Sequence, residues 1–214
     1  MICKIGEEEM TDKIQYGFFV DTTKCTGCKT CQVACKDRSD LSLGVKWRRV
    51  YEYGGGSWTE NEDGTFNNNV FAHYTSISCN HCSHPVCVKA CPTGACHKRK
   101  SDGLVHIEAS LCVGCQSCSR ACPYDAPQFD SERGVMTKCD GCYDRLEQGL
   151  NPTCVDSCPL RALEFGPIDE LRNKHGDNAD IQPLPSSDIT SPNLIIKVNR
   201  NAQPGGEILN EFEV

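Results

Sequence analysis

The stretch Cys112–Pro123, CVGCQSCSRACP, decides how this chain folds. Its cysteines follow the spacing C-x2-C-x2-C-x3-C-P, which is typical of [4Fe-4S] binding in bacterial ferredoxins. In such a run the first three thiolates bind one cubane, and the fourth, here Cys122, ligates a different cluster. On a helical turn Cys118 and Cys122 would lie about 6 Å apart along the axis. One run therefore predicts two clusters close together, and a second run of cysteines elsewhere in the chain.

Cysteine quartets occur four times in the sequence, and the stretch above is the third of them. Each quartet keeps two residues between its first two cysteines and three between its last two, while the middle gap is 2, 4, 2 and 11 residues in chain order. A repeat of this kind predicts four related loops. The quartets are Cys25, Cys28, Cys31 and Cys35; Cys79, Cys82, Cys87 and Cys91; Cys112, Cys115, Cys118 and Cys122; and Cys139, Cys142, Cys154 and Cys158.

The cysteine content indicates either disulfides or bound metal, since the 214 residues include 18 Cys but only 2 Trp and 3 Met. Disulfides need an oxidising compartment, and residues 1–17 contain neither an apolar signal segment nor twin arginine. Zinc also binds C-x2-C pairs, but zinc ribbons separate two such pairs by a long gap. Two quartets here place four thiols within 11 residues. We therefore predict iron-sulfur clusters, with Cys3 and Cys96 outside the quartets and Cys96 as a buried apolar residue.

The x3 spacing also predicts which quartets share ligands, because each quartet contributes its last cysteine to a partner quartet. Quartets two and three are neighbours in the sequence, so we expect them to be partners, and quartets one and four would then enclose them. The four expected ligand sets are set one, Cys25, Cys28, Cys31 and Cys158; set two, Cys35, Cys139, Cys142 and Cys154; set three, Cys79, Cys82, Cys87 and Cys122; and set four, Cys91, Cys112, Cys115 and Cys118.

The expected fold class is α+β, with two interleaved modules of the bacterial-ferredoxin type, each holding two [4Fe-4S] clusters. An inserted β-hairpin and an extended C-terminal tail complete the chain. The expected boundaries are an N-terminal extension at 1–14, the first module at 15–40 and 124–166, the hairpin at 41–78, the second module at 79–123 and the C-terminal extension at 167–214.

Local patterns predict the main elements. Alternating segments at Lys46–Tyr53 and Val70–Ile77 flank a turn-rich stretch and predict the hairpin. The residues Tyr16–Asp21 are strand-like, and short helices are expected at Tyr143–Gln148 and Ile168–Lys174. A shorter hairpin between quartets two and three is expected to have its second strand near 104–108. The Pro-, Ser- and Asn-rich tail after the helix at Ile168–Lys174 is expected to build no core of its own and to wrap a partner subunit or stay mobile.

The remaining features exclude several functions. A formal net charge of −7 argues against a nucleic-acid surface. No run approaches the 18 or so apolar residues of a membrane span. His81 and His84 lack the spacing of a two-histidine cluster site and are expected to face solvent. The sequence has no nucleotide loop and no catalytic triad, and every quartet saturates its irons with thiolate, so we expect an electron carrier without a direct small-molecule substrate.

Seven segments carry a family resemblance: QYGFFVD, CTGCKTC, SISCNHC, CPYDAPQF, MTKCDGCYDR, SCPLRAL and FGPIDELRNKHGD. With the quartets, they make the chain from about Gln15 to about Ile195 resemble the four-cluster electron-transfer subunit of the bacterial dimethyl sulfoxide reductase family. The resemblance implies a molybdopterin catalytic subunit and an integral membrane anchor that oxidises menaquinol as partners. Some relatives replace one cysteine of the third quartet by Trp and hold a [3Fe-4S] cluster. Cys115 is present here, so four [4Fe-4S] clusters are expected.

Alternatives remain open from the sequence. The chain would otherwise be the relay subunit of another molybdopterin oxidoreductase, a free polyferredoxin, or a zinc-structured interaction module. The resemblance implies a peripheral location on the bacterial inner membrane through the anchor. Co-export with a folded catalytic subunit would place the chain on the periplasmic face, which we expect, and the cytoplasmic face is the alternative.

Overall fold

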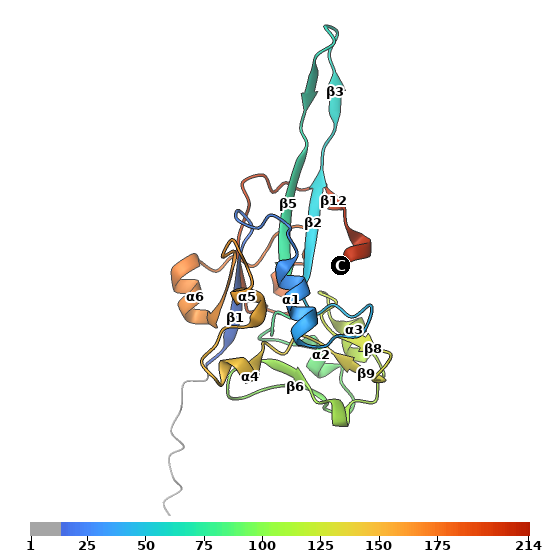
Figure 1. Ribbon diagram of the computed structural model, residues 1–214, viewed down its shortest axis with the longest axis vertical. Helices are drawn as coiled ribbons and strands as arrows, with labels where there is room; N and C mark the ends of the chain where they lie inside the picture. The colour runs from blue at the N-terminus through green and yellow to red at the C-terminus, as the bar shows by residue number, and fades with distance from the viewer. Residues whose placement is uncertain (1–13) are drawn as a thin grey trace, which may run out of the picture.

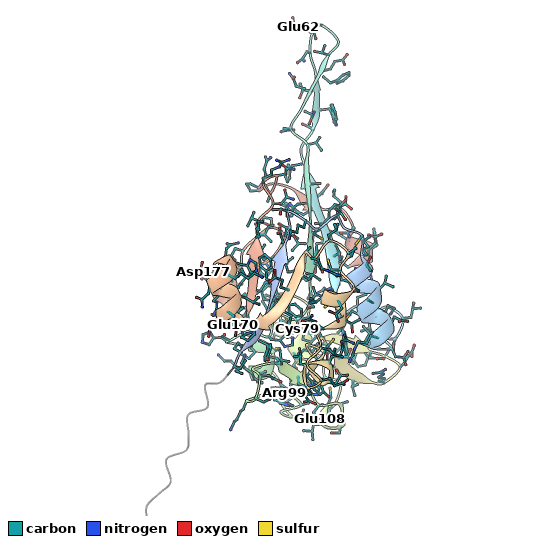
Figure 2. All side chains as sticks on the ribbon, turned by 60° about the vertical axis from the view of Figure 1, so that its left-hand side comes forward. Glu62, Cys79, Arg99, Glu108, Glu170 and Asp177 are labelled. Carbon is teal, nitrogen blue, oxygen red and sulfur yellow. The ribbon has the colours of Figure 1, made fainter. Side chains whose placement is uncertain are left out.

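The computed structural model describes residues 14–214, so Cys3 and nearly all of the expected N-terminal extension lie outside the described residues. The described chain forms a body from which a long two-stranded arm projects (Figure 1). Cys79 lies within the body, whereas Glu62 lies at the tip of the arm (Figure 2).

A three-stranded sheet forms one side of the body. Its central strand β1 (Tyr16–Asp21) runs antiparallel to β10 (Leu163–Pro167) and parallel to β11 (Leu194–Lys197). Strand side chains alternate between the two faces. Phe18 therefore packs into the main core, while Phe19 packs on the other face against helix α6. Helix α6 spans Ile168–His175, one residue longer than predicted.

The C-terminal tail corrects the expectation drawn from its composition. Strand β11 lies beside β1, and Ile195 within it is fully buried. Strand β12 (Glu207–Ile208) pairs with strand β2 of the arm. The short run Leu194–Lys197 contains three apolar residues, two of them the β-branched Ile195 and Ile196, which is enough to form a buried strand even between polar flanks. The tail is therefore part of the body of this chain.

The predicted hairpin is confirmed as the arm of the molecule. Strands β2 (Arg49–Gly55) and β5 (Phe71–Ile77) pair antiparallel, and β3 (Trp58–Glu60) and β4 (Phe66–Asn68) continue the arm outward (Figure 1). The inner end of the arm is buried in the body, and the outer end is exposed.

Short hairpins and helices fill the rest of the body. Strands β6 (Cys96–Lys98) and β7 (Val105–Ile107) form the hairpin predicted between quartets two and three, and β8 (Gln128–Asp130) pairs with β9 (Val135–Thr137). The α+β fold class is thus confirmed. The remaining helices are α1 (Thr30–Arg38), α2 (Val86–Lys89), α3 (Ser117–Ala121), α4 (Tyr143–Leu146), which ends two residues before the predicted end, and α5 (Thr153–Asp156).

No helix within residues 14–214 has the length and apolar character needed to cross a bilayer.

Candidate metal centres

The four Cys-x2-Cys loops repeat one backbone feature. In each loop the residue before the second cysteine has a left-handed φ, which is 72° at Gly27, 44° at His81, 66° at Gly114 and 74° at Gly141. Glycine adopts this conformation freely, whereas a side chain costs roughly 1–2 kcal/mol there. The turn brings the backbone N–H groups of Gly27 and His81 toward the first thiol of their own loops. The sequence repeat is therefore also a repeat of geometry.

The third cysteine of every quartet begins a helix in the same way. Cys31, Cys87, Cys118 and Cys154 are each the second residue of α1, α2, α3 and α5. All four side chains are buried. The start of each helix thus fixes a thiol that points into the body.

Backbone amides from neighbouring strands and turns also donate to the cysteine sulfurs. The N–H groups of Cys96, Met136 and Ala162 lie 3.3 Å from the Sγ atoms of Cys91, Cys112 and Cys158, respectively. A donor at this position favours a negatively charged sulfur over a neutral thiol. These hydrogen bonds therefore favour the thiolate form, in which the sulfur can bind iron.

A surface groove gathers the four thiols of set one. Cys158, from the last quartet, lines this groove together with three cysteines of the first quartet. Burial and the neighbouring thiols of Cys31, Cys158 and Cys28 raise the pKa of Cys25 to about 11. The groove residues that belong to set one are Cys25, Cys28, Cys31 and Cys158.

Set two lies in the interior. Burial raises the pKa of Cys35, and the thiols of Cys139, Cys154 and Cys142 raise it further because thiolate charges at short range repel. Cys35 lies on α1, while the other three cysteines come from the last quartet more than a hundred residues later. All four side chains are buried.

Set three gathers across quartets two and three. Burial and the thiols of Cys79, Cys122 and Cys87 raise the pKa of Cys82 to about 12. Of these four, only Cys122 comes from the third quartet.

In set four the exchange runs the other way, because Cys91 of the second quartet joins three cysteines of the third quartet. The thiol of Cys91 is near both Cys115 and Cys118. Cys91 and Cys112 pack against the apolar cluster that contains Cys118.

Cysteines of consecutive sets lie close together, from set one to set four. Cys31 of set one lies near Cys154 of set two. Cys139 of set two packs with Cys79 of set three. Cys87 of set three packs with Cys118 of set four. The sets therefore form a line from one to four.

Exposure distinguishes the ends of that line. Among the cysteines in the described part of the chain, Cys28 and Cys115 are exposed, and all others are buried or half-buried. Cys28 belongs to set one and Cys115 to set four. Exposed apolar side chains stand beside them, Leu160 at the groove of set one and Val113 next to Cys115. The inner sets have no exposed thiol.

Two buried cations stand between the sets. Arg48 is 1% exposed and Lys138 is 3% exposed. Within residues 14–214, neither forms an ion pair with a carboxylate. Burial alone would lower the pKa of Arg48, but the thiols of Cys154 and Cys31 outweigh burial and raise it. In the same way, Cys79 and Cys139 outweigh burial and raise the pKa of Lys138.

The residues of the four sets fit [4Fe-4S] clusters in their chemistry. Every set offers thiols only, which are the ligands that these clusters take. Buried side-chain donors without a hydrogen-bond partner occur beside the cysteines, including Arg48 Nε, Asn80 Nδ2 and His81 Nε2. Such donors suit an anionic group with sulfur acceptors. Within residues 14–214, no three His, Cys, Asp or Glu side chains form a group that could hold a single metal ion.

The prediction that His81 faces solvent is wrong, whereas the predictions of an exposed His84 and a buried Cys96 are confirmed. His81 is fully buried, and its Nδ1 accepts a hydrogen bond from the Val105 N–H at 3.0 Å. The proton of the neutral ring therefore sits on Nε2. His84 is exposed, and Cys96 is buried against Cys87 and Cys118.

The sequence interpretation missed Arg48 and Lys138 as parts of the site. A signal existed for Arg48, because it precedes the inward-facing Val50 by two residues in an alternating segment. For Lys138 the only signal is its position directly before Cys139.

Comparison with known proteins adds independent support. Residues 70–168 match the family described as a 4Fe-4S dicluster domain, and residues 22–44 match a 4Fe-4S binding domain. The sequence is 58% identical over 193 residues to the B subunit of the anaerobic dimethyl sulfoxide reductase of Escherichia coli, covering 90% of this chain and 93% of the relative. The protein of the same name from Haemophilus influenzae is also 58% identical, covering 90% of this chain and 94% of the relative. The thiosulfate reductase electron transfer subunit PhsB of Salmonella typhi is 36% identical over 73% of this chain and 78% of its own length.

The resemblance predicted from the sequence is thus confirmed over nearly the whole chain. The thiol-rich loops, the matching 4Fe-4S families and the named relatives agree on a non-catalytic iron-sulfur electron-transfer subunit. The chain therefore belongs to the family of iron-sulfur electron-transfer subunits represented by the B subunits of the anaerobic dimethyl sulfoxide reductases.

Proposed function

We propose that this chain relays electrons through four [4Fe-4S] clusters, one in each ligand set. The electrons would come from a quinol-oxidising membrane anchor and pass to a molybdopterin catalytic subunit that reduces dimethyl sulfoxide or related S- and N-oxides. The observation that carries this proposal is the line of four thiol sets, whose only exposed described cysteines, Cys28 and Cys115, belong to the first and last sets. Such an arrangement suits entry at one end and exit at the other.

Each bound cluster would supply a site that accepts and releases one electron. The residues of the chain hold, insulate and tune these sites. The helix starts at Cys31, Cys87, Cys118 and Cys154 fix the ligand positions. Backbone N–H groups stabilise the sulfur charge. Apolar side chains of the three-stranded sheet and of the inner end of the arm pack against Cys31, Cys154 and Cys158 of sets one and two.

The proposed interleaving of two modules is supported by the pairing of β1 with β10. These strands flank quartet one and quartet four, and their register pairs Tyr16 with Pro167 and Val20 with Leu163. The pairing would close the first module, at 15–40 and 124–166, around the second module at 79–123.

The choice of substrate class rests on the degree of similarity. The relatives from Escherichia coli and Haemophilus influenzae named for anaerobic dimethyl sulfoxide reductase are 58% identical to this chain over 193 residues. Relatives named for thiosulfate reductase and sulfite dehydrogenase are 36% identical, as is one from Halobacterium salinarum named for dimethyl sulfoxide reductase. A second candidate is therefore the relay subunit of another molybdopterin oxidoreductase. In either case the substrate pocket would lie on the catalytic subunit.

The proposed location is the periplasmic face of the inner membrane, where the anchor would hold the chain as a peripheral subunit. The chain would reach that face by export with its folded catalytic partner. Protease added to intact spheroplasts should then degrade the chain, and a chain that is cut only after lysis would instead lie on the cytoplasmic face.

Metal analysis tests the four-cluster proposal. The anaerobically purified protein should contain about 16 iron and 16 sulfide per chain, since each of four cubanes carries four of each. Zinc without sulfide would refute the proposal. A tagged chain expressed in its native host should also be recovered from membranes with a molybdopterin protein and an integral membrane protein, whereas recovery of the chain alone would favour a free polyferredoxin.

A further inference from the structure

We propose that Arg48 and Lys138 are shared counter-charges of the bound clusters. Arg48 would raise the reduction potentials of the clusters in sets one and two, and Lys138 those in sets two and three. The cluster in set four would be affected by neither. This inference rests on the proposed four-cluster function and adds two positioning residues to it.

Arg48 lies in an environment that lacks any compensating carboxylate. Its guanidinium is buried, stacks at 4.6 Å from the centre of the Phe18 ring, and forms no ion pair within residues 14–214. A buried charge is costly unless an opposite charge stands nearby. The nearest groups able to carry negative charge are thiols of sets one and two, among them Cys31 and Cys154.

A hydrogen-bond chain links Arg48 to set one. Arg48 Nη1 donates to Ser76 Oγ at 3.1 Å, and Ser76 Oγ lies 3.2 Å from Cys31 Sγ. A guanidinium can only donate, so the Ser76 oxygen accepts from Arg48. A cluster-bound Cys31 would be a thiolate, which can only accept, so the hydroxyl hydrogen of Ser76 would then be directed to Cys31 Sγ. Ser78 Oγ holds the other end of the guanidinium at 2.9 Å. Arg48 Nε has no protein partner and remains available to the anionic site around Cys154.

Lys138 occupies the corresponding position between sets two and three. Its Nζ donates to the carbonyl oxygens of Val105 and, at 2.7 Å, of Cys139. The thiols beside the ammonium are Cys79 of set three and Cys139 of set two, which together keep its pKa raised despite burial. The ammonium is thereby fixed where both sets are within reach.

Reduction adds a negative charge to a cluster, so a fixed cation nearby stabilises the reduced form more than the oxidised form. The interaction is stronger inside the protein than in water because the local dielectric constant is lower. It falls with distance, which is why each cation should act on the two sets beside it. Set four contributes none of the thiols that raise the pKa of either cation, and its Cys115 is at the surface.

Arg49 provides a matched control for Arg48. It is the next residue, it is also buried, and it forms no carboxylate ion pair within residues 14–214. It faces the other side of the strand, where it donates to the Tyr124 carbonyl oxygen at 2.5 Å and lies 5.6 Å from the Tyr51 ring centre. Arg49→Gln therefore removes the same charge without touching the Ser76–Cys31 chain.

The test is a redox titration of the anaerobically purified complex, monitored by electron paramagnetic resonance, with signals assigned through Cys31→Ser, Cys154→Ser, Cys87→Ser and Cys118→Ser. Arg48→Gln should lower the potentials of the set one and set two signals by about 59 mV or more, which is tenfold in a one-electron equilibrium. Lys138→Gln should lower those of sets two and three. Arg49→Gln should leave sets one and two unchanged.

Ser76→Ala decides the case if the cation variants fail to fold, because it keeps both charges and removes only the hydrogen directed to Cys31. It should lower the potential of the set one signal alone. Potentials of sets one and two that stay at wild-type values in Arg48→Gln, or of set one in Ser76→Ala, would overturn this inference while leaving the four-cluster function intact. Wild-type protein with fewer than four cubanes would instead overturn the proposed function.

Discussion

The region around sets one and two contains a large hydrophobic core, whereas the main apolar cluster around sets three and four is much smaller. The first region packs Phe18, Val20, Ile77 and Leu163 with its cysteines, among other buried apolar residues. In the second region, the main apolar cluster consists of Val105, Met136 and three cysteines. Most of the buried residues in this second cluster are therefore cysteines. The comparison suggests that side-chain packing stabilises the first region and that bound clusters stabilise the second.

Topology deepens the difference between the two regions. In the first, β1 pairs with β10 and β11, which lie more than 140 residues later in the chain. In the second, β6 and β7 form a local hairpin. Strand pairs of three residues with little core beneath them are marginal on their own. The second region gains its order from its ligands, which is a common solution where the core is small.

Removal of iron should have the largest effect, and it should fall on the second region. In the iron-free protein, the amides of β6 and β7 should exchange at rates close to those of an unfolded chain, while those of β1 and β10 stay protected. Hydrogen exchange with peptide-level mass spectrometry measures both. Equal protection of the two regions without iron would refute the comparison.

Truncation of Ile195 should reveal how strongly packing between the three-stranded sheet and α6 stabilises the first region. Ile195→Ala removes a fully buried side chain from β11 and should lower the free energy of unfolding by about 2–5 kcal/mol. Urea denaturation of the iron-free protein, followed through the aromatic side chains of the sheet, gives the value. The control Val198→Ala, at an exposed position after the same strand, should change it by less than about 0.5 kcal/mol.

Thiol labelling should separate the regions by reactivity. In iron-free protein, Cys79, Cys87 and Cys118 should react with iodoacetamide at similar rates, because their region opens. In the first region, exposed Cys28 should react at least about tenfold faster than buried Cys154, which corresponds to about 1.4 kcal/mol of opening free energy. Mass-spectrometric mapping of a timed pulse reports each site. Labelling of Cys154 as fast as Cys28 would show that the first region also opens.

A pH-dependent ion pair should contribute the smallest effect, and it belongs to the first region. Glu164 Oε2 lies 2.8 Å from Lys174 Nζ and 3.0 Å from His175 Nε2, which joins β10 to α6. Burial alone would raise the pKa of Glu164, but these donors lower it below 4.5. A lowered pKa stabilises the fold above pH 4.5, and the contribution is lost as the pH falls through the folded value.

Glu164→Gln should therefore lower the free energy of unfolding by no more than about 1 kcal/mol at pH 7, because the pair is partly exposed and screened. The difference from wild type should shrink as the pH falls below 4.5 and Glu164 becomes protonated in the folded protein. A difference that stays constant over this range would mean that the side chain acts through packing.

The sequence predicted the parts that repeat. The quartet spacing indicated four related loops, and the alternating segments indicated the arm and β1, because both signals are local and periodic. The misses depend on packing between distant residues. The burial of His81 follows from its hydrogen bond with Val105, and the strand at Ile195 needs β1 as its partner. No local pattern shows either partner.

The burial of Arg48 also could not be predicted from the sequence. Arg48 reads as a surface residue by composition, since arginine is seldom fully buried. Its neighbours Ser76 and Cys31 come from separate segments, and only folding brings them together. The assignment of ligands to sets remains a prediction drawn from spacing, supported by which thiols are neighbours.

The exchange of last cysteines between quartets is the central claim, and Cys35 tests it most directly. Cys35 is four residues from Cys31 on helix α1, yet the two are assigned to different clusters. Spin-resonance spectra of the reduced Cys31→Ser, Cys35→Ser and Cys154→Ser proteins measure which signal each change affects. We predict that Cys35→Ser and Cys154→Ser alter the same signal and that Cys31→Ser alters another. A shared signal for Cys31→Ser and Cys35→Ser, with a different one for Cys154→Ser, would contradict the exchange.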